Sequence, residues 1–102
     1  MDDKSIEQEI QDKGLTEPRV TLAEIEAVIH DEKYHIIPGT TTTICCLVLR
    51  NGFTVIGESS CVSAKNFDQA IGRKIAKDNA KDKIWALEGY LLKQKQYEQG
   101  RN

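Results

Sequence analysis

The sequence predicts an α+β fold: two short N-terminal helices, an antiparallel hairpin-based small sheet, and a long or bent C-terminal helical segment. Three observations support this prediction. Two helix-start signals lie in the first quarter of the chain, two β-rich runs are joined by Asn51-Gly52, and apolar residues recur at helical spacing after Asn66. Because 102 residues suffice for one modest core and are too few for two, residues 1–102 are expected to form a single domain.

Two capping boxes mark the N-terminal helices. Ser5 is followed three positions later by Gln8, and Thr21 is followed by Glu24. In such pairs the two side chains satisfy exposed backbone N–H groups at a helix start. Apolar residues follow Thr21 at helical spacing, so the second helix is expected to run to about Asp31.

The central segment predicts a small sheet. Residues 34–39 (YHIIPG) are typical of a brief extended piece ended by a turn, and they leave a third strand open. The next run, TTTTICCLVLRNGFTVIGESS, joins two β-rich stretches through Asn51-Gly52. This dipeptide tolerates the positive φ angles of a type I′ turn, so the run predicts a hairpin.

A two-residue turn determines which residues of the hairpin share a face. It pairs Val48 with Val55 on one face and Leu47 with Ile56 on the other, so both faces are largely apolar. One helical layer in so small a chain covers only one face, and the other is expected to meet the N-terminal helices or a second subunit. We therefore expect a homodimer or a higher homo-oligomer.

The C-terminal third predicts one long helical segment. Asn66 is a suitable N-cap, and an apolar stripe passes through Ile71 and Ile75 and continues toward the C-terminus. A continuous helix from there to residue 96 would be about 45 Å long, whereas a globule of this size is about 34 Å across. The helix is therefore expected either to project or to bend, at the polar run 77–83 or at Gly89.

Charge and composition exclude several classes of function. Residues 1–33 carry ten acidic and four basic residues, a net charge of −6, whereas residues 34–102 carry ten basic and six acidic residues, a net charge of +4. The whole chain, at −2, gains little from a phosphate backbone, so nucleic acid is not the expected partner. No signal peptide is visible and no apolar run approaches about 20 residues. We expect a cytoplasmic protein without membrane association.

No catalytic or metal-binding pattern is visible in the sequence. The phosphate-loop, nucleophile-elbow and zinc-protease motifs are absent, and the carboxylates are scattered as solvating charge. The three cysteines, two of them adjacent, fit reduced, buried thiols better than disulfides or a metal site. We therefore expect no enzymatic activity, no metal and no cofactor.

A cationic ridge is the main candidate for a binding site. Arg73, Lys77 and Lys81 are spaced by four on the predicted C-terminal helix and so share one face. The ridge is either a solvated face partly neutralised by Asp78 and Asp82, or a phosphate clamp in which Arg73 gives bidentate hydrogen bonds.

Two further residues break the amphipathic pattern of this helix. Asn79 lies four residues after Ile75, so its amide is either satisfied inside a core or aimed into a pocket. Phe67 begins the same stripe at the helix entrance, where an aromatic ring either belongs to the core or stacks on a base.

Two stretches of the chain resemble a known family. The run CLVLRNGFTVIGESSCVSAKNFDQAIGRKIAKDNAKDKIWALEGYLL and the upstream KGLTEPRVT are similar to the small tailed-phage family of gene product forty-nine of a coliphage and gene product sixty-six of a Shigella phage. Together they cover most of residues 13–92. The chain departs from the family in its short connection HIIPGTTTT and in having Ala86 where the family often has Pro. The resemblance implies a phage accessory protein acting in the host cytoplasm.

The predicted arrangement is also similar to the first class of Thoeris anti-defence proteins. Those phage proteins bind a cyclic ADP-ribose-type immune signal without cutting it and assemble through a sheet and C-terminal helices. This similarity implies a sponge for a cyclic nucleotide, of the cyclic ADP-ribose type or a cyclic oligonucleotide. In the sponge hypothesis paired subunits form a recess, in which Arg19 and Arg73 contact phosphates, Phe67 stacks on a base and Asn79 contacts the base edge.

Two other functions stay open at this point. A phage inhibitor of a host protein would use the acidic N-terminal third as its contact surface. A structural or DNA-metabolism accessory protein is the third possibility. A sponge needs a concave, convergent basic pocket, whereas an inhibitor can use a flat acidic patch.

Overall fold

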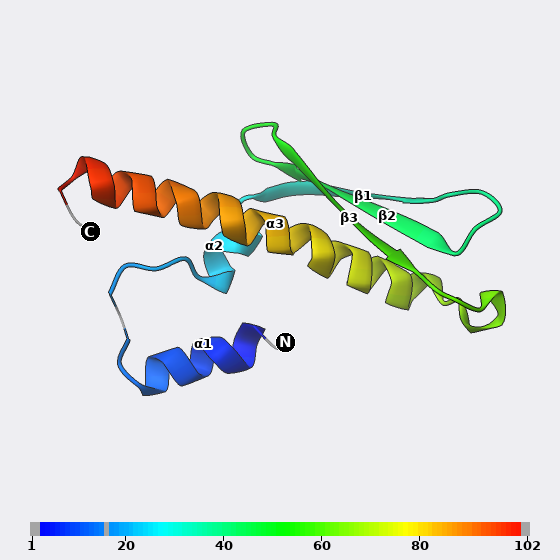
Figure 1. The fold of residues 1–102 in the computed structure, drawn as a ribbon, viewed down its shortest axis with the longest axis horizontal. Coiled ribbons are helices and arrows are strands. Elements are labelled where there is room, and N and C mark those ends of the chain that lie inside the picture. Colours follow the sequence, from blue (N-terminus) through cyan, green and yellow to red (C-terminus); the bar gives the residue numbers. More distant parts are fainter. Residues whose placement is uncertain (1–2, 16, 101–102) are drawn as a thin grey trace.

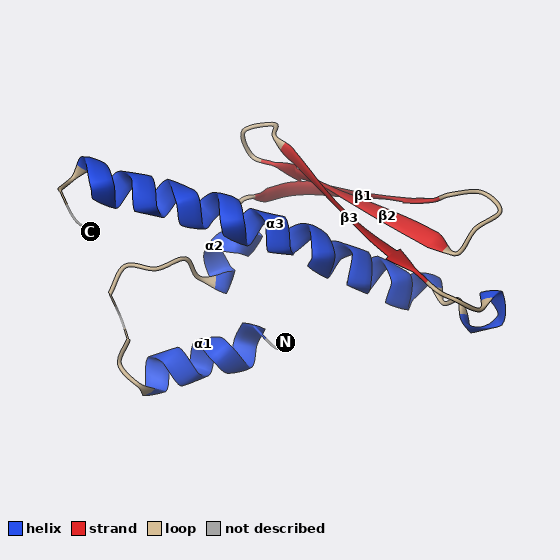
Figure 2. Cartoon of the chain, viewed as in Figure 1, coloured by secondary structure: helices blue, strands red, loops and turns tan. Residues whose placement is uncertain are grey.

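The computed structural model describes residues 3–15 and 17–100. The elements in chain order are α1 (Asp3–Asp12), α2 (Leu22–Ala27), β1 (Ile29–Ile36), β2 (Thr42–Leu49), β3 (Thr54–Ser60), a 3-10 turn (Ala64–Asn66) and α3 (Gln69–Glu98). The strands form one antiparallel sheet in the order β1-β2-β3, and α3 lies across it (Figures 1 and 2). The predicted α+β fold is confirmed.

Helix α2 is shorter than the sequence predicts. Its N-cap is Thr21, whose hydroxyl accepts a hydrogen bond from the Glu24 N–H at 3.2 Å, as expected. The helix ends at Ala27 rather than near Asp31, because β1 begins at Ile29 and pairs with β2 along its whole length. Tertiary pairing with β2 therefore overrides the local helical spacing, and the third strand is present and starts earlier than predicted.

The hairpin between β2 and β3 is confirmed, but its predicted register is wrong by one residue. The turn has three residues rather than two: the Leu49 N–H donates to the Phe53 carbonyl at 2.8 Å, and Gly52 has a φ of +90°. Leu47 therefore lies opposite Val55, not Ile56. A Gly in the left-handed region after a short turn is the usual form of a three-residue hairpin loop.

The core lies between one face of the sheet and α3. Alternate residues of β2 and β3 point into it, together with small residues of the helix. The buried apolar residues are Ile25, Cys45, Leu47, Leu49, Val55, Ala76, Ala80 and Ile84. Among the three free cysteines only Cys45 is buried, so the expectation that all three are buried is wrong.

The buried stripe of α3 differs from the predicted one. It runs through Gly72, Ala76, Ala80 and Ile84, whereas Ile71 is 57% exposed and Ile75 is also exposed. The reason is close packing: a Cβ atom placed on Gly57 of β3 would lie 2.2 Å from both the Ala76 carbonyl oxygen and the Ala80 nitrogen. Only small residues allow the helix to come this near to the strand.

Helix α3 is continuous and projects. Its N-cap is Asp68, whose carboxylate accepts from the Ile71 N–H at 3.0 Å, rather than the predicted Asn66, which lies in the 3-10 turn. Neither the run 77–83 nor Gly89 interrupts the helix. Its C-terminal part extends past the sheet (Figure 1), in a molecule of 53 × 32 × 19 Å. No helix within the described residues is long and apolar enough to span a membrane.

The outer face of the sheet keeps an exposed apolar surface. Helix α2 contacts α3 and β1, and α1 contacts α2. On the outer face Ile56 is 49% exposed. The expectation that a second subunit covers part of the sheet stays a prediction.

Candidate ligand-binding crevice between α3 and β1

Helix α3 lies over β2 and β3 and leaves a crevice above β1. Its contacts with the sheet are chiefly with β3 and β2, because Gly57 and the small residues of α3 draw the helix backbone onto β3. Among the described residues, α3 reaches β1 through the long side chains of Arg73 and Lys77. The space between them measures about 450 Å³ and is lined by Glu26, Ile29, His30, Asp31, Glu32, Lys77 and Lys81.

A β-bulge in β1 directs polar side chains toward this crevice. Ile29 lies opposite Leu49 and Asp31 lies opposite Val48, so His30 is an extra residue in β1. Because alternation restarts after the bulge, Glu32 and Tyr34 lie opposite Leu47 and Cys45, the residues of β2 that face α3. Bulges commonly re-aim side chains in this way near functional sites.

Each residue of the cationic ridge of α3 contacts a residue of β1 or α2. The Lys77 ammonium lies 2.8 Å from Glu32 Oε2, and the Lys81 ammonium lies 4.0 Å from Glu26 Oε1. One turn earlier, the Arg73 guanidinium lies over the Tyr34 ring, 5.4 Å from its centre. The acidic partners of Lys77 and Lys81 are therefore on β1 and α2, rather than Asp78 and Asp82 as one of the two interpretations of the ridge has it.

The environment sets the charge state of the crevice. The hydrogen bond from Lys77 lowers the pKa of Glu32 below its ordinary value of 4.5. Burial raises the pKa of Tyr34 well above its ordinary range, and its hydroxyl donates to Glu32 Oε1 at 2.9 Å. Burial also raises the pKa of the Cys45 thiol. At neutral pH the Glu32 carboxylate of the crevice is therefore ionised, whereas the neighbouring Tyr34 phenol and the Cys45 thiol of the core are neutral.

A protein-family model matches most of the elements that build this crevice. The model is that of the phage protein (N4 Gp49/phage Sf6 gene 66) family, and it matches residues 20–96, from the entrance of α2 to near the end of α3. The chain belongs to this family. Comparison with curated proteins and with solved structures finds no match. The family match confirms the resemblance seen in the sequence, whereas the relation to Thoeris anti-defence proteins stays a prediction.

Two of the predicted ligand-binding residues lie on opposite flanks of α3 in this phage protein. Arg73 is on the β1 flank, over Tyr34. Asn79 is on the β3 flank, where its side-chain amide donates to the Glu58 carbonyl at 2.7 Å. The Asn79 amide is thus satisfied by a strand edge, and it is exposed rather than buried in the core.

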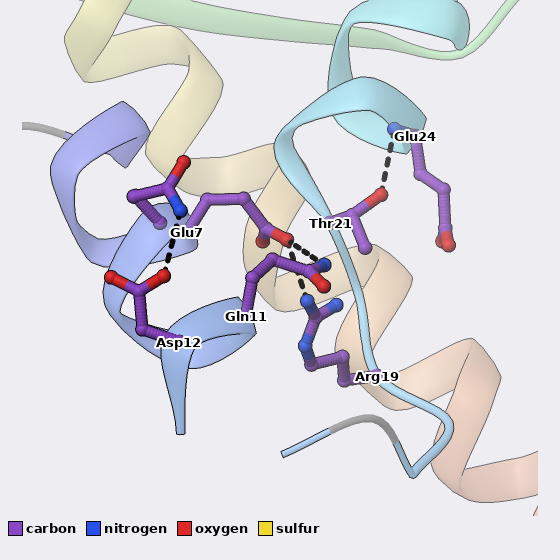
Figure 3. Close-up of polar contacts among 7 residues, drawn as sticks. Glu7, Gln11, Asp12, Arg19, Thr21 and Glu24 are labelled. Carbon is purple, nitrogen blue, oxygen red and sulfur yellow. Dashed lines mark hydrogen bonds and ion pairs between the residues drawn. The ribbon is translucent and has the colours of Figure 1, made fainter. Parts of the chain in front are cut away.

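The other two predicted residues lie elsewhere again. Arg19 precedes the family match and donates to Glu7 Oε2 at 2.6 Å, which ties the loop before α2 to α1 (Figure 3). Phe67 is half-buried, and its ring lies near Gly72 at the start of α3. Within one chain the structure therefore does not bring Arg19, Phe67, Arg73 and Asn79 together, and their roles in ligand binding stay predictions.

The sequence interpretation missed the β1 side of the crevice. Helical spacing assigns residues up to Asp31 to a helix, and this assignment hides the alternation of Glu32, Tyr34 and Ile36 along one face of a strand. That alternation is the signal that identifies these side chains. Within residues 3–15 and 17–100, no group of three or more His, Cys, Asp or Glu side chains is placed to hold a metal ion.

Proposed function

We propose that this phage protein binds and sequesters a cyclic nucleotide immune signal in the host cytoplasm, without cleaving it. The observation that carries the proposal is a crevice of about 450 Å³ lined by Lys77 and Lys81, with Arg73 one turn earlier on the same flank of α3. A crevice of this size falls within the range of small-ligand sites. The ligand class is a cyclic nucleotide, either of the cyclic ADP-ribose type or a cyclic oligonucleotide.

The ridge keeps capacity to bind a phosphate although its lysines already have partners. An ammonium has three N–H donors, and the ion pairs of Lys77 and Lys81 each use one carboxylate oxygen. The Lys77 pair is partly exposed, and such pairs contribute at most about 1 kcal/mol. A phosphate bearing full negative charge can therefore share or displace Glu32. Arg73 adds a fork that suits two phosphate oxygens.

The other groups of the crevice suit the uncharged parts of a nucleotide. Glu26, Asp31 and Glu32 provide acceptors for ribose hydroxyls or a base amino group. Beside the crevice, the Arg73 guanidinium stacks on the Tyr34 ring, and this stacked pair offers a base a planar cationic surface. This assignment keeps Arg73 from the four residues predicted from the sequence and adds Tyr34, Lys77 and Lys81.

Sequestration without cleavage fits the protonation states. A general acid must hold a proton near the working pH. The pKa of Glu32 is lowered by Lys77, and the pKa of Tyr34 is raised, so neither group exchanges a proton near neutrality. These two groups are therefore poorly suited to acid–base catalysis, which supports the proposed role in binding.

The test is a titration of the purified protein with cyclic ADP-ribose and with cyclic dinucleotides, followed by heating and chromatography. The proposal predicts saturable binding and recovery of the intact compound after denaturation. A raised absorbance at 260 nm that denaturation releases would already reveal a bound nucleotide. Absence of binding to every compound, or recovery of a hydrolysed product, would contradict the proposal.

A second candidate is an inhibitor that binds a host protein through the acidic N-terminal part. It is favoured by α1, which has no buried residue among those described and carries exposed acidic side chains such as Glu9 and Asp12. Reversing both charges, with Glu9→Lys and Asp12→Lys, separates the two functions. The readout is whether the protein still protects the phage from the host immune system. If the double variant loses this protection but still binds the nucleotide, the inhibitor is supported. If the protection is unchanged, the sponge is supported.

A further inference from the structure

The Glu32 carboxylate is bound at both of its oxygen atoms. Its Oε2 atom lies 2.8 Å from the Lys77 ammonium, and its Oε1 atom accepts a hydrogen bond from the Tyr34 hydroxyl at 2.9 Å. The ammonium comes from α3, and the hydroxyl comes from the same strand as Glu32. Lys77 and Tyr34 therefore form a pair of donors that converge on one anionic group.

This pair of donors also suits a phosphate group. Hydrogen bonds from an ammonium or a hydroxyl to an anionic oxygen are among the stronger ones in proteins. A phosphate, like a carboxylate, carries its oxygens on one central atom, so it can accept from both donors at once. Burial raises the pKa of Tyr34, so its hydroxyl keeps the proton that it donates at neutral pH. In the structure the Glu32 carboxylate thus occupies a position that fits a ligand phosphate.

The Glu32 carboxylate lies within reach of a ligand. The described residues that line the crevice include Glu32 and Lys77 but not Tyr34. The side chains of Glu32 and Lys77 are 40% and 35% exposed, and the Tyr34 hydroxyl bonds to the carboxylate. A ligand therefore meets Lys77 directly, whereas it reaches the Tyr34 hydroxyl when Glu32 moves away.

The other two carboxylates of the crevice are held differently. Glu26 lies 4.0 Å from the Lys81 ammonium, which is a looser contact. Asp31 pairs with Lys33 of its own strand at 3.2 Å and accepts from the Glu32 N–H at 2.8 Å. Of the three carboxylates, Glu32 therefore competes most closely with a ligand for a cation of the ridge.

We infer that Glu32 is an internal competitor at a phosphate subsite formed by the Lys77 ammonium and the Tyr34 hydroxyl, and that a ligand phosphate displaces its carboxylate and takes both donors. The inference rests on the proposed function for the identity of the ligand, and it adds where a phosphate binds and what it displaces. Because any anion must first break the Glu32 contacts, free inorganic phosphate is held more weakly than the two donors alone would hold it.

Titration with inorganic phosphate at constant ionic strength, followed by NMR shifts of the backbone amides, tests the subsite. Glu32→Gln removes the competing charge and should tighten phosphate binding about three- to tenfold, as expected for the loss of one partly exposed ion pair and its hydrogen bond. Melting followed by circular dichroism should show equal or lower stability. An ion pair with a purely structural role would lose stability without any gain in phosphate binding, and that result overturns the inference.

The matched control is Asp78→Asn. Asp78 is exposed and adjoins Lys77 in the sequence, and it is not among the residues that line the crevice. The substitution removes the same unit of charge without freeing a donor, and salt screens its effect. Phosphate binding should change by less than about twofold. If Asp78→Asn tightens binding as much as Glu32→Gln, the gain comes from net charge and the inference is overturned.

A second substitution tests the hydroxyl. In the Glu32→Gln background, Tyr34→Phe removes the hydroxyl donor and keeps the ring on which Arg73 stacks. Phosphate binding should fall by about fivefold or more, because a hydrogen bond to a charged group is lost. An unchanged affinity would show that the phosphate does not reach Tyr34, and the subsite would be wrong.

Titration of the same variants with cyclic ADP-ribose and cyclic dinucleotides separates this inference from the proposed function. Glu32→Gln should tighten nucleotide binding as it tightens phosphate binding. If a nucleotide binds and Glu32→Gln leaves its affinity unchanged or lower, the subsite is overturned and the proposed function stands. If phosphate binding depends on Glu32 but no cyclic nucleotide binds, the proposed function is overturned and the subsite stands. Absence of both kinds of binding overturns both.

Discussion

The two flanks of α3 meet the sheet in different ways. On the β3 flank, Gly57 lets the helix backbone approach the strand, and contact is made by the smallest side chains of the helix. On the β1 flank, contact is made by long charged side chains, of which Lys77 reaching Glu32 is the shortest ion pair. Because α3 packs closely on β3, it lies away from β1 and leaves the crevice there. The same packing therefore explains both the fold and the candidate site.

The largest expected effect comes from filling the close contact. Gly57→Val places side-chain atoms where the α3 backbone lies, with the first of them 2.2 Å from Ala76 and Ala80. We expect a loss of about 4 kcal/mol or more in the free energy of unfolding, enough to prevent stable folding. Urea denaturation followed by circular dichroism measures it.

The matched control for that prediction is Gly89→Ala. A Cβ at Gly89 meets nothing within 4 Å, and the residue lies inside α3. Replacing a mid-helix glycine should raise the stability by about 0.5–1 kcal/mol. Equal effects of the two substitutions would mean that α3 does not touch β3 as described.

The identity of the buried stripe predicts the next effect. Ile84 has no exposed surface, whereas Ile71 is 57% exposed. Ile84→Ala should cost about 2–5 kcal/mol through lost burial and a cavity, and Ile71→Ala should cost less than about 0.5 kcal/mol in the monomer. Unfolding at protein concentrations too low for self-association makes the comparison. If Ile71→Ala lowered the free energy of unfolding more than Ile84→Ala, the buried stripe of α3 would be the one predicted from the sequence.

A smaller effect is expected outside the family match. Arg19 donates to Glu7 at 2.6 Å (Figure 3), and its Nε is buried without a hydrogen-bond partner. Glu7→Gln removes the charge-assisted bond and should cost about 1–2 kcal/mol, confined to α1 and the loop before α2. Hydrogen exchange should rise in α1 and stay constant in α3. A uniform rise would show that α1 is part of the same cooperative unit as the core.

The smallest effect is a pH dependence on the β1 flank. Lys77 lowers the pKa of Glu32 in the folded protein below the 4.5 of the unfolded chain. The ion pair therefore adds stability above pH 4.5, and this stability is lost as the pH falls through the folded pKa. For a partly exposed pair the amount is at most about 1 kcal/mol. Glu32→Gln should flatten the stability curve below pH 4.5. An unchanged curve would show that the pair contributes nothing.

The sequence predicted the elements better than their contacts. Asn51-Gly52 identified the hairpin, but the loop also includes Arg50, and one added residue exchanges the faces of β3 relative to β2. Helical spacing identified α3, but it favoured Ile71 and Ile75 over Gly72 and Ala76. The choice between those stripes depends on Gly57, which is distant in sequence, and no local pattern reports that approach.

The candidate site was predicted in part. Spacing by four correctly places Arg73, Lys77 and Lys81 on one flank of α3. Their partners Glu32 and Tyr34 were missed, because the local pattern around β1 also suits a helix end and only pairing with β2 decides for a strand. Residue spacing along a helix is therefore enough to predict the cationic ridge, whereas the residues that face the ridge are known only once the tertiary structure is known.

Calorimetric titration of cyclic ADP-ribose-type and cyclic oligonucleotide signals into three proteins tests the central claim, that the two flanks of α3 have separate roles. The unaltered protein and Ile56→Lys should bind alike. Arg73→Lys keeps the charge but loses the bidentate fork, so it should bind about ten- to a hundredfold more weakly with an unchanged melting temperature. Equal binding by Arg73→Lys, or loss of binding in Ile56→Lys, would contradict the separation, and no binding by the unaltered protein would contradict the proposed function itself.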